Sequence, residues 1–190
     1  MELKERVQQA FAKLANPSSN DLKKAIKSLK ITLEELQPYL NDPETFPYGR
    51  NIIYKNDTVE VVVNNWANRF ACAPHDHGKS FGWIYFVYGD ALHEIYTLDQ
   101  KEVLTHTATR IEKEGTAFLE TSQLIHSIEN PSEQDMLVTF HVYSPPIKDM
   151  KVYNLEKCLG CIVSEKCGAW WPDEQREVFK FMKQSRKIKN

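Results

Sequence analysis

The sequence lacks the features of a nucleic-acid-binding, membrane or secreted protein. Its 24 Lys and Arg residues nearly balance its 26 Asp and Glu residues, and the net charge of -2 leaves no basic field to hold nucleic acid. No apolar run approaches the ~20 residues of a membrane-spanning helix, and residues 1–6 lack the apolar core of a signal peptide. We therefore expect a cytoplasmic protein that binds neither nucleic acid nor a membrane.

The chain is also poor in cysteine and has no repeats or low-complexity segments. Of its four cysteines, Cys72 is expected to be buried packing, and Cys158, Cys161 and Cys167 cluster near the C-terminus. Cys-x2-Cys is the spacing of half a zinc site or of a redox pair, but no histidine follows to complete a zinc site. We expect a reduced cluster without a ligand, with a disulfide or a metal as the alternative.

The length of 190 residues suits a single structural domain with additions. We expect residues 1–47 to form a helical segment packed on the outside of a barrel, and residues 48–150 to form that barrel. Residues 151–190 should form an extension with the cysteine cluster and a helix from Pro172. Nothing in the sequence resembles a long apolar interface helix, so we expect a monomer.

Apolar residues recur at helical spacing in three stretches of the N-terminal segment. Asn20 is expected to cap the second helix and Thr32 the third, where Glu35 would complete a capping box. The apolar positions are Leu3, Val7, Phe11 and Leu14, then Leu22, Ile26 and Leu29, then Leu33, Leu36, Tyr39 and Leu40.

From about residue 48 the pattern changes to the alternation of β-strands. Short strands at regular spacing, with few helices between them, indicate an antiparallel sandwich or barrel, which is an all-β fold. The predicted strands cover residues 51–54, 58–66, 81–88, 91–96, 105–111, 116–119, 125–130 and 137–143.

Two histidines separated by one residue, His75 and His77, would share one face of a strand and could bind one metal ion. Such a pair is weak evidence alone, but His126 supplies a third imidazole far downstream. The spacing of the two stretches matches the two cupin motifs, which predicts a cupin jelly-roll β-barrel. The matching positions are His75, His77, Gly89, Gly115, His126 and Asn130.

The usual cupin carries a glutamate where this chain has Gly82. We therefore expect three neutral histidines without a carboxylate, which would leave about three positions of an octahedral ion open. The more positive site that results would favour an anionic thiolate ligand. Two other histidines, His93 and His106, fit no such pattern and are expected at the surface.

From about Tyr48 to Pro146 the chain resembles the cysteine dioxygenases, the thiol dioxygenase branch of the cupins. Several motifs in the right order make the resemblance specific. They are Tyr48-x-Arg50-Asn51, Trp66 ahead of Pro74-His75-Asp76-His77, His126, and the closing run His141-Val142-Tyr143-Ser144-Pro145-Pro146.

The resemblance implies that Fe(II) is bound by His75, His77 and His126. Cysteine would chelate the iron through its thiolate and amine and leave one position for dioxygen. The product would be cysteine sulfinic acid. The implied partners are therefore a small thiol and dioxygen.

The resemblance also implies roles for four residues around the metal: Arg50 and Tyr48 in substrate binding, and His141 and Tyr143 in catalysis. Arg50, in the segment that begins at Tyr48, would pair with the substrate carboxylate. Tyr143 would point its hydroxyl at substrate and oxygen and would be oriented by His141. The alternatives are a surface arginine at Arg50 and simple core packing for the Tyr143 ring.

This chain departs from the family at two positions. Some members carry, in place of Gly82, a cysteine that forms a thioether to the tyrosine; Tyr143 is expected to lack that crosslink, as in bacterial-type members. Thr139 replaces a common serine but keeps the hydroxyl of a hydrogen-bond relay. The family's Ser-Pro bond is cis, and the sequence alone does not decide this for Ser144-Pro145.

Taken together, the sequence predicts an iron-dependent thiol dioxygenase for L-cysteine. The nearest alternative is the same chemistry on 3-mercaptopropionate, whose branch places its carboxylate-binding arginine elsewhere. A non-catalytic metal-binding cupin or sensor is an alternative of another class. A zinc or manganese isomerase cupin is disfavoured because those sites generally keep the glutamate that Gly82 displaces.

Overall fold

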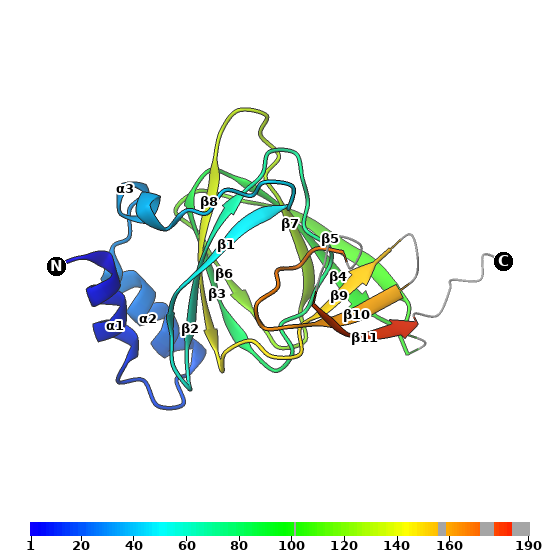
Figure 1. Ribbon diagram of the computed structural model, residues 1–190, viewed down its shortest axis with the longest axis horizontal. Coiled ribbons are helices and arrows are strands. Elements are labelled where there is room, and N and C mark those ends of the chain that lie inside the picture. Colours follow the sequence, from blue (N-terminus) through cyan, green and yellow to red (C-terminus); the bar gives the residue numbers. More distant parts are fainter. Residues whose placement is uncertain (101, 156–158, 172–176, 184–190) are drawn as a thin grey trace.

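The computed structural model describes the chain except residues 101, 156–158, 172–176 and 184–190. It confirms the predicted all-β cupin barrel with helices at the N-terminus (Figure 1). The helical elements are α1 (Leu3–Phe11), α2 (Ser19–Leu29), α3 (Leu33–Leu36) and the 3-10 turn Gln37–Tyr39. The strands are β1 (Tyr48–Lys55), β2 (Glu60–Trp66), β3 (Phe81–Tyr88), β4 (Ala91–Leu98), β5 (Leu104–Glu112), β6 (Ala117–Glu120), β7 (Ile125–Glu129), β8 (Leu137–Ser144), β9 (Lys151–Asn154), β10 (Leu159–Val163) and β11 (Val178–Lys183).

The barrel is built from antiparallel strands in two main sheets. A five-stranded sheet has the order β1-β2-β8-β3-β6, and a three-stranded sheet has the order β5-β4-β7. A further three-stranded sheet, β11-β10-β9, comes from the C-terminal segment and lies beside the barrel (Figure 1). The barrel interior between the two main sheets is where the site residues meet.

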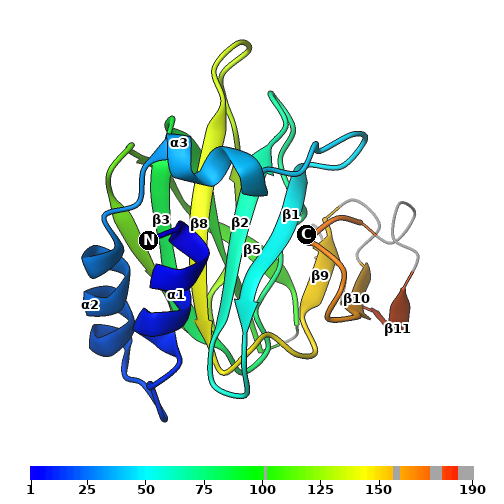
Figure 2. The ribbon, with the colours of Figure 1, turned by 60° about the vertical axis from the view of Figure 1, so that its left-hand side comes forward.

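Helices α1 and α2 cover the outer face of the five-stranded sheet (Figure 2). Their buried residues are the apolar positions predicted from the helical spacing. The indole N–H of Trp83 in β3 also donates to the Ser19 carbonyl at 2.8 Å. The capping box of Thr32 and Glu35 is confirmed, but Ser18 caps α2 in place of Asn20, because the Ser18 hydroxyl accepts the hydrogen bond of the Asp21 amide.

Strand β8 shows how alternation sorts side chains between the two cores. Val138, Phe140 and Val142 pack in the cluster that includes the helices. The intervening residues face the barrel interior, where Leu137 and Tyr143 join the second apolar cluster. One strand thus both anchors the helices and carries residues of the site.

The C-terminal segment differs from its prediction. The prediction of a helix from Pro172 is wrong for Val178–Lys183, because these residues form β11 and pair with β10. Residues 172–176 lie outside the described part of the chain. Cross-strand hydrogen bonding to β10 decides the conformation here. Cys158 of the predicted cluster also lies outside the described residues, whereas Cys72, Cys161 and Cys167 are buried.

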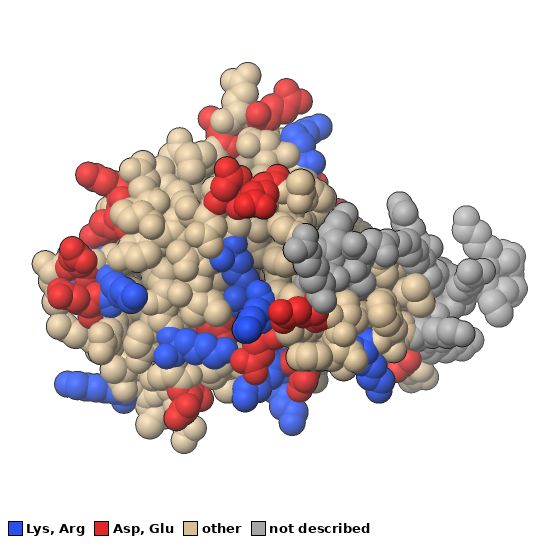
Figure 3. All heavy atoms as spheres, viewed as in Figure 1, with Lys and Arg blue, Asp and Glu red and all other residues tan. Residues whose placement is uncertain are grey.

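Acidic and basic side chains are interspersed over the face shown in Figure 3, in agreement with the balanced composition. Among the described residues, no helix combines the length and the apolar character that a bilayer crossing requires.

Candidate metal and substrate site

The three predicted metal ligands meet inside the barrel. His126 lies in β7, and His75 lies in the loop between β2 and β3, where its amide and carbonyl pair with those of His126 at 2.9 and 3.0 Å. His77 follows in the same loop, so the expected strand for this histidine pair is not formed. The loop nevertheless brings the rings together: their centroids are 4.6 to 5.1 Å apart, and one ligand atom from each lies within 4.8 Å of the others.

Hydrogen bonds at the far nitrogens orient two of these rings. The Nδ1 atom of His75 donates to the Ala73 carbonyl at 2.9 Å, which leaves its Nε2 as the ligand atom. The Nδ1 atom of His126 lies 2.8 Å from Nε2 of His93, and the Nε2 atom of His126 has no hydrogen-bond partner in the part of the chain that the structure describes. His93 is fully buried and belongs to the site, so its predicted surface position is wrong, while His106 is exposed as expected.

Burial keeps the three imidazoles neutral. It lowers the pKa of His75 and holds the pKa values of His77 and His126 well below the usual value of histidine. Neutral imidazole is the form that binds metals. The donor set and its protonation therefore fit a transition-metal ion.

A carboxylate stands beside the histidines, which corrects the expectation of a site without an acid. Glu120, at the end of β6, places Oε1 3.0 Å from His126 Nε2 and 3.6 Å from His77 Nε2. The sequence prediction missed it because Leu119, its neighbour, is the apolar residue that alternation would turn inward. In the structure Leu119 is exposed and Glu120 is fully buried.

A hydrogen-bond chain on β2 and β8 ends at the Tyr143 hydroxyl, as predicted for His141 and Tyr143. Trp66 Nε1 donates to Thr139 Oγ1 at 2.8 Å, and Thr139 Oγ1 lies 2.7 Å from His141 Nε2. His141 Nδ1 then lies 2.9 Å from the Tyr143 hydroxyl, which is 3.4 Å from His77 Nε2. Thr139 thus preserves the relay that a serine forms in the family.

The direction of the chain follows from its first donor. An indole N–H can only donate, so the Thr139 hydroxyl proton remains available for His141 Nε2. The proton of a neutral His141 is then on Nδ1 and points to Tyr143. Burial lowers the pKa of His141 to about 4 and, with the charge of Glu120, raises the pKa of the Tyr143 phenol well above its usual value.

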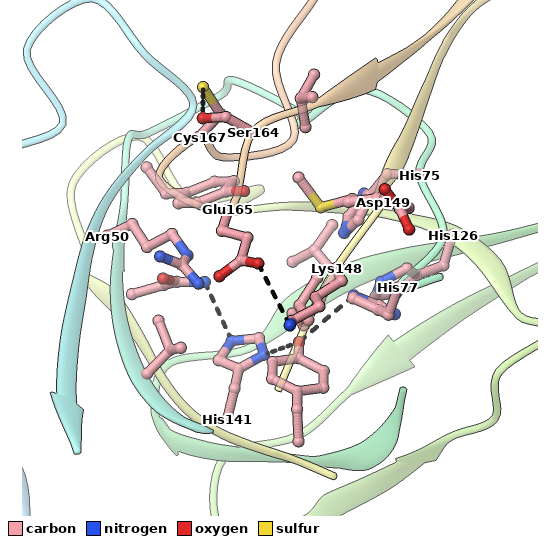
Figure 4. Close-up of a pocket in the computed structure, with 18 of the residues that line it drawn as sticks. Arg50, His75, His77, His126, His141, Lys148, Asp149, Ser164, Glu165 and Cys167 are labelled. Carbon is pink, nitrogen blue, oxygen red and sulfur yellow. Dashed lines mark hydrogen bonds and ion pairs between the residues drawn. The ribbon is translucent and has the colours of Figure 1, made fainter. Parts of the chain in front are cut away.

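Arg50 borders the same cavity as the histidines, but its guanidinium is already paired. Its Nη2 contacts Oε1 of the buried Glu60, and Lys55 Nζ lies 3.2 Å from the other carboxylate oxygen. Figure 4 shows Arg50 and the three histidines on opposite sides of the cavity, with His141 between them in this view. A molecule bound in the cavity could therefore reach both groups.

Tyr48 also borders the cavity, where its hydroxyl accepts the hydrogen bond of the Ala169 amide. Its ring packs on Trp66 with centroids 4.7 Å apart. Tyr48 thus connects the barrel to the C-terminal segment.

The cavity is small, about 30 Å³, and the C-terminal segment closes part of it. The segment contributes Val163, Ser164, Glu165 and Cys167 to the lining. Glu165 forms an ion pair with Lys55 at 3.0 Å, from the barrel side. These residues were not predicted to belong to the site. The Ser144-Pro145 peptide bond, next to Tyr143, is cis.

A family model described as "Cysteine dioxygenase type I" matches residues 5–156. The cysteine dioxygenase type 1 of Rattus norvegicus is 22% identical over 142 residues, which cover 66% of this chain and 71% of the relative. That of Danio rerio is 20% identical over 151 residues, covering 70% of this chain and 75% of the relative.

The chain is also similar, at low sequence identity, to solved structures. A protein with a double-stranded β-helix domain from Klebsiella pneumoniae has a TM-score of 0.49 at 14% identity and covers 58% of this chain and 86% of its own. An oxalate oxidase has a TM-score of 0.49 at 15% identity, covering 64% of this chain and 63% of its own.

Proposed function

The chain belongs to the cysteine dioxygenase type I family, and we propose that it is an Fe(II)-dependent thiol dioxygenase that oxidises L-cysteine to cysteine sulfinic acid. In this reaction the thiol R–SH and dioxygen combine to R–SO2H, so both oxygen atoms end on sulfur. The observation that carries the proposal is the meeting of three neutral imidazoles, an arginine and a tyrosine hydroxyl around one small cavity.

His75, His77 and His126 would hold the iron. When bound, Fe(II) would supply a redox-active centre that brings thiolate and dioxygen together, so that their encounter becomes intramolecular. The barrel holds the three histidines in place. The hydrogen bond between His126 Nδ1 and His93 Nε2 leaves His126 Nε2 as the nitrogen that would bind the iron.

Tyr143 would be the proton-bearing group nearest the metal. Because its oxygen accepts the Nδ1 proton of His141, its own proton is free to be donated towards the substrate or an oxygen atom. The raised pKa keeps this phenol protonated. His141 is then a positioning residue, which acts through Tyr143.

Arg50 would bind the substrate carboxylate, with Tyr48 shaping the same wall. The pairing of Arg50 with Glu60 leaves the guanidinium only partly available, which keeps 3-mercaptopropionate as the alternative substrate. The small cavity supports a substrate of few atoms for either assignment.

Turnover of both thiols decides between these substrates. Oxygen consumption and sulfinate formation would be measured for wild type, Arg50→Ala and Arg69→Ala, an exposed arginine that serves as the matched control. We expect wild type to prefer cysteine and Arg50→Ala to lose at least about tenfold in kcat/KM for cysteine, because a charge-assisted carboxylate contact is removed. Cysteine turnover that Arg50→Ala leaves unchanged would contradict the assignment.

The same assay tests the class of protein. A non-catalytic cupin or sensor would consume no oxygen with iron and cysteine, and metal analysis of the purified protein would show whether iron, zinc or manganese is bound. We further propose that the enzyme acts as a cytoplasmic monomer, and its mass in solution tests the oligomeric state.

A further inference from the structure

The carboxylate of Glu120, in the barrel wall, faces His77 and His126. Among the described residues it forms no other ion pair. Glu120 is fully buried, and its carboxylate oxygens have no well-aligned hydrogen-bond partner within the same part of the chain, although the carboxylate is close enough to the Tyr143 hydroxyl to raise the pKa of that phenol. Buried carboxylates are normally paired with a cation or bound to a metal.

The two imidazoles do not meet this need by themselves. The nitrogen closest to the carboxylate, His126 Nε2, is a buried atom that has no hydrogen-bond partner among the described residues, although it lies 3.0 Å from Glu120 Oε1. The other ring nitrogen of His126, Nδ1, lies 2.8 Å from His93 Nε2, and a proton on Nδ1 leaves Nε2 with a lone pair. The lone pairs of His126 Nε2 and Glu120 Oε1 therefore point into the same space, and a cation bound there would satisfy both atoms.

The strand register explains how this carboxylate reaches the site. Glu120 in β6 is directly opposite Gly82 in β3, and paired residues of antiparallel strands project their side chains to the same face. Gly82 stands where the usual cupin carries its glutamate. The neighbouring strand thus brings a carboxylate to the region that the glycine leaves without one.

We propose that Glu120 is the fourth protein ligand of the metal held by His75, His77 and His126. Its distances of 3.0 and 3.6 Å to two imidazole nitrogens are close to the ~3 Å that separates neighbouring donors on an ion with bonds of about 2.1 Å. The inference rests on the proposed metal site but not on the identity of the thiol.

A fourth protein ligand changes what the site offers. On a six-coordinate ion it leaves two positions, which suffice for a thiolate and dioxygen. The chelation by thiolate and amine that the family resemblance implies would need the third position that three histidines alone leave. The fourth ligand also lowers the net charge of the loaded site by one. The sequence disfavours a zinc or manganese cupin because Gly82 replaces the usual glutamate ligand. If Glu120 supplies the carboxylate instead, that argument against zinc or manganese no longer holds.

The test compares cobalt binding by metal-free wild type, Glu120→Gln and Glu94→Gln. Glu94→Gln makes the same charge change on β4, where the side chain is partly exposed and contacts Tyr96. We expect Glu120→Gln to bind Co(II) at least about tenfold more weakly and to show a different visible absorption spectrum, with the control matching wild type. Equal affinity and an unchanged spectrum in Glu120→Gln would overturn the inference.

Melting of the metal-free proteins separates ligand loss from misfolding. Glu120→Gln replaces a buried carboxylate by a neutral amide of similar size, so we expect it to melt at or above the wild-type temperature without metal and to gain less on adding cobalt. Glu120→Asp, which keeps the carboxylate, should recover part of the affinity even if the glutamine variant folds poorly; no recovery there would count against the inference. Failure of wild type to bind cobalt would overturn the metal site and the proposed function together, whereas equal binding by all variants would overturn only the role of Glu120.

Discussion

His93 fixes the tautomer of a metal-binding histidine. With His126 Nε2 directed at the metal position, its Nδ1 carries the proton and donates to His93 Nε2 at 2.8 Å. On the far side of His93, Glu112 Oε1 lies 3.5 Å from Nδ1. Such outer partners hold a ligand ring in place and raise its basicity. In the proposed metal site His93 would therefore influence metal affinity through its hydrogen bond to His126.

Replacing this partner should weaken metal binding. We expect His93→Phe to lower the affinity for Co(II) by about 10- to 100-fold, because the Nδ1 proton of His126 loses its acceptor inside the barrel. Calorimetric titration of the metal-free protein measures the effect. His106→Phe, on the neighbouring strand and exposed, is the control and should bind as wild type does. If His93→Phe bound Co(II) as tightly as wild type, His93 would have no role in positioning His126 for metal binding.

Residues of the site differ in how far sequence alone could reveal them. His75, His77 and His126 were predictable because their spacing repeats a known pattern. His93 could have been found by alternation, since it lies two residues from the buried Ala91 on the same face of β4. Glu120 could not, because the preference of carboxylates for water and of Leu119 for burial predicts the opposite orientation.

At the scale of elements, the contact between β3 and β8 limits what can stand at Gly82. A Cβ atom there would lie well inside van der Waals contact of the Val142 carbonyl oxygen and 2.8 Å from Tyr143 Cδ1. The close approach positions the Tyr143 ring, which stacks on His77 with centroids 4.9 Å apart. Gly82 therefore not only excludes a thioether crosslink to Tyr143. Because it has no side chain, it also allows β8, which carries Tyr143, to pack closely against β3.

A methyl group at this position should therefore be costly. We expect Gly82→Ala to lower the free energy of unfolding by about 1–3 kcal/mol, as overpacking does, because backbone atoms of β8 must shift. Urea denaturation measures this. Gly160→Ala in β10 is the matched control, since its nearest neighbour would be the flexible end of Met182 at 3.3 Å. Equal stability of the two variants would show that the contact at Gly82 is relaxed.

Strong local patterns predicted the elements of the barrel, whereas the C-terminal strands depend on each other. Strand β3 has the predicted bounds, because alternation and the Gly89 turn both mark it. Strands β9, β10 and β11 are short, and β11 pairs with β10 only after the intervening residues 164–177. Phe179, Lys180 and Phe181 alternate as a strand would, but both phenylalanines are exposed, so the apolar residues of β11 do not mark a buried face.

At the scale of the whole molecule, the site is completed by a segment beyond the metal-binding barrel. Ser164, Glu165 and Cys167 border the cavity, and the Ala169 amide is bound by the Tyr48 hydroxyl. The family match ends at residue 156, before these residues. Ser164, Glu165 and Cys167 therefore belong to the part of the cavity wall that the family model does not cover, and here the substrate contacts can differ from those of other family members.

The buried histidines also link the stability of the whole fold to pH. In the folded chain the pKa of His141 is about 4, against about 6.5 in an unfolded chain, because burial disfavours the charged ring. Between these two values the unfolded chain binds a proton that the folded chain does not. The free energy of unfolding must then fall as pH falls through this window, and it changes no further from this group below pH 4.

The expected size of the full effect is about 3–4 kcal/mol for His141, from a pKa difference of about 2.5 at about 1.4 kcal/mol for each pH unit. Metal-free His77 and His126 act in the same direction, whereas acids with lowered pKa values, such as Asp21 and Glu35, lose their contribution at lower pH. Urea denaturation of metal-free wild type and His141→Gln at pH 7 and pH 4.5 measures the difference. The variant should lose less stability on acidification, because glutamine does not titrate. Parallel losses in the two proteins would mean that His141 is not held neutral by the barrel.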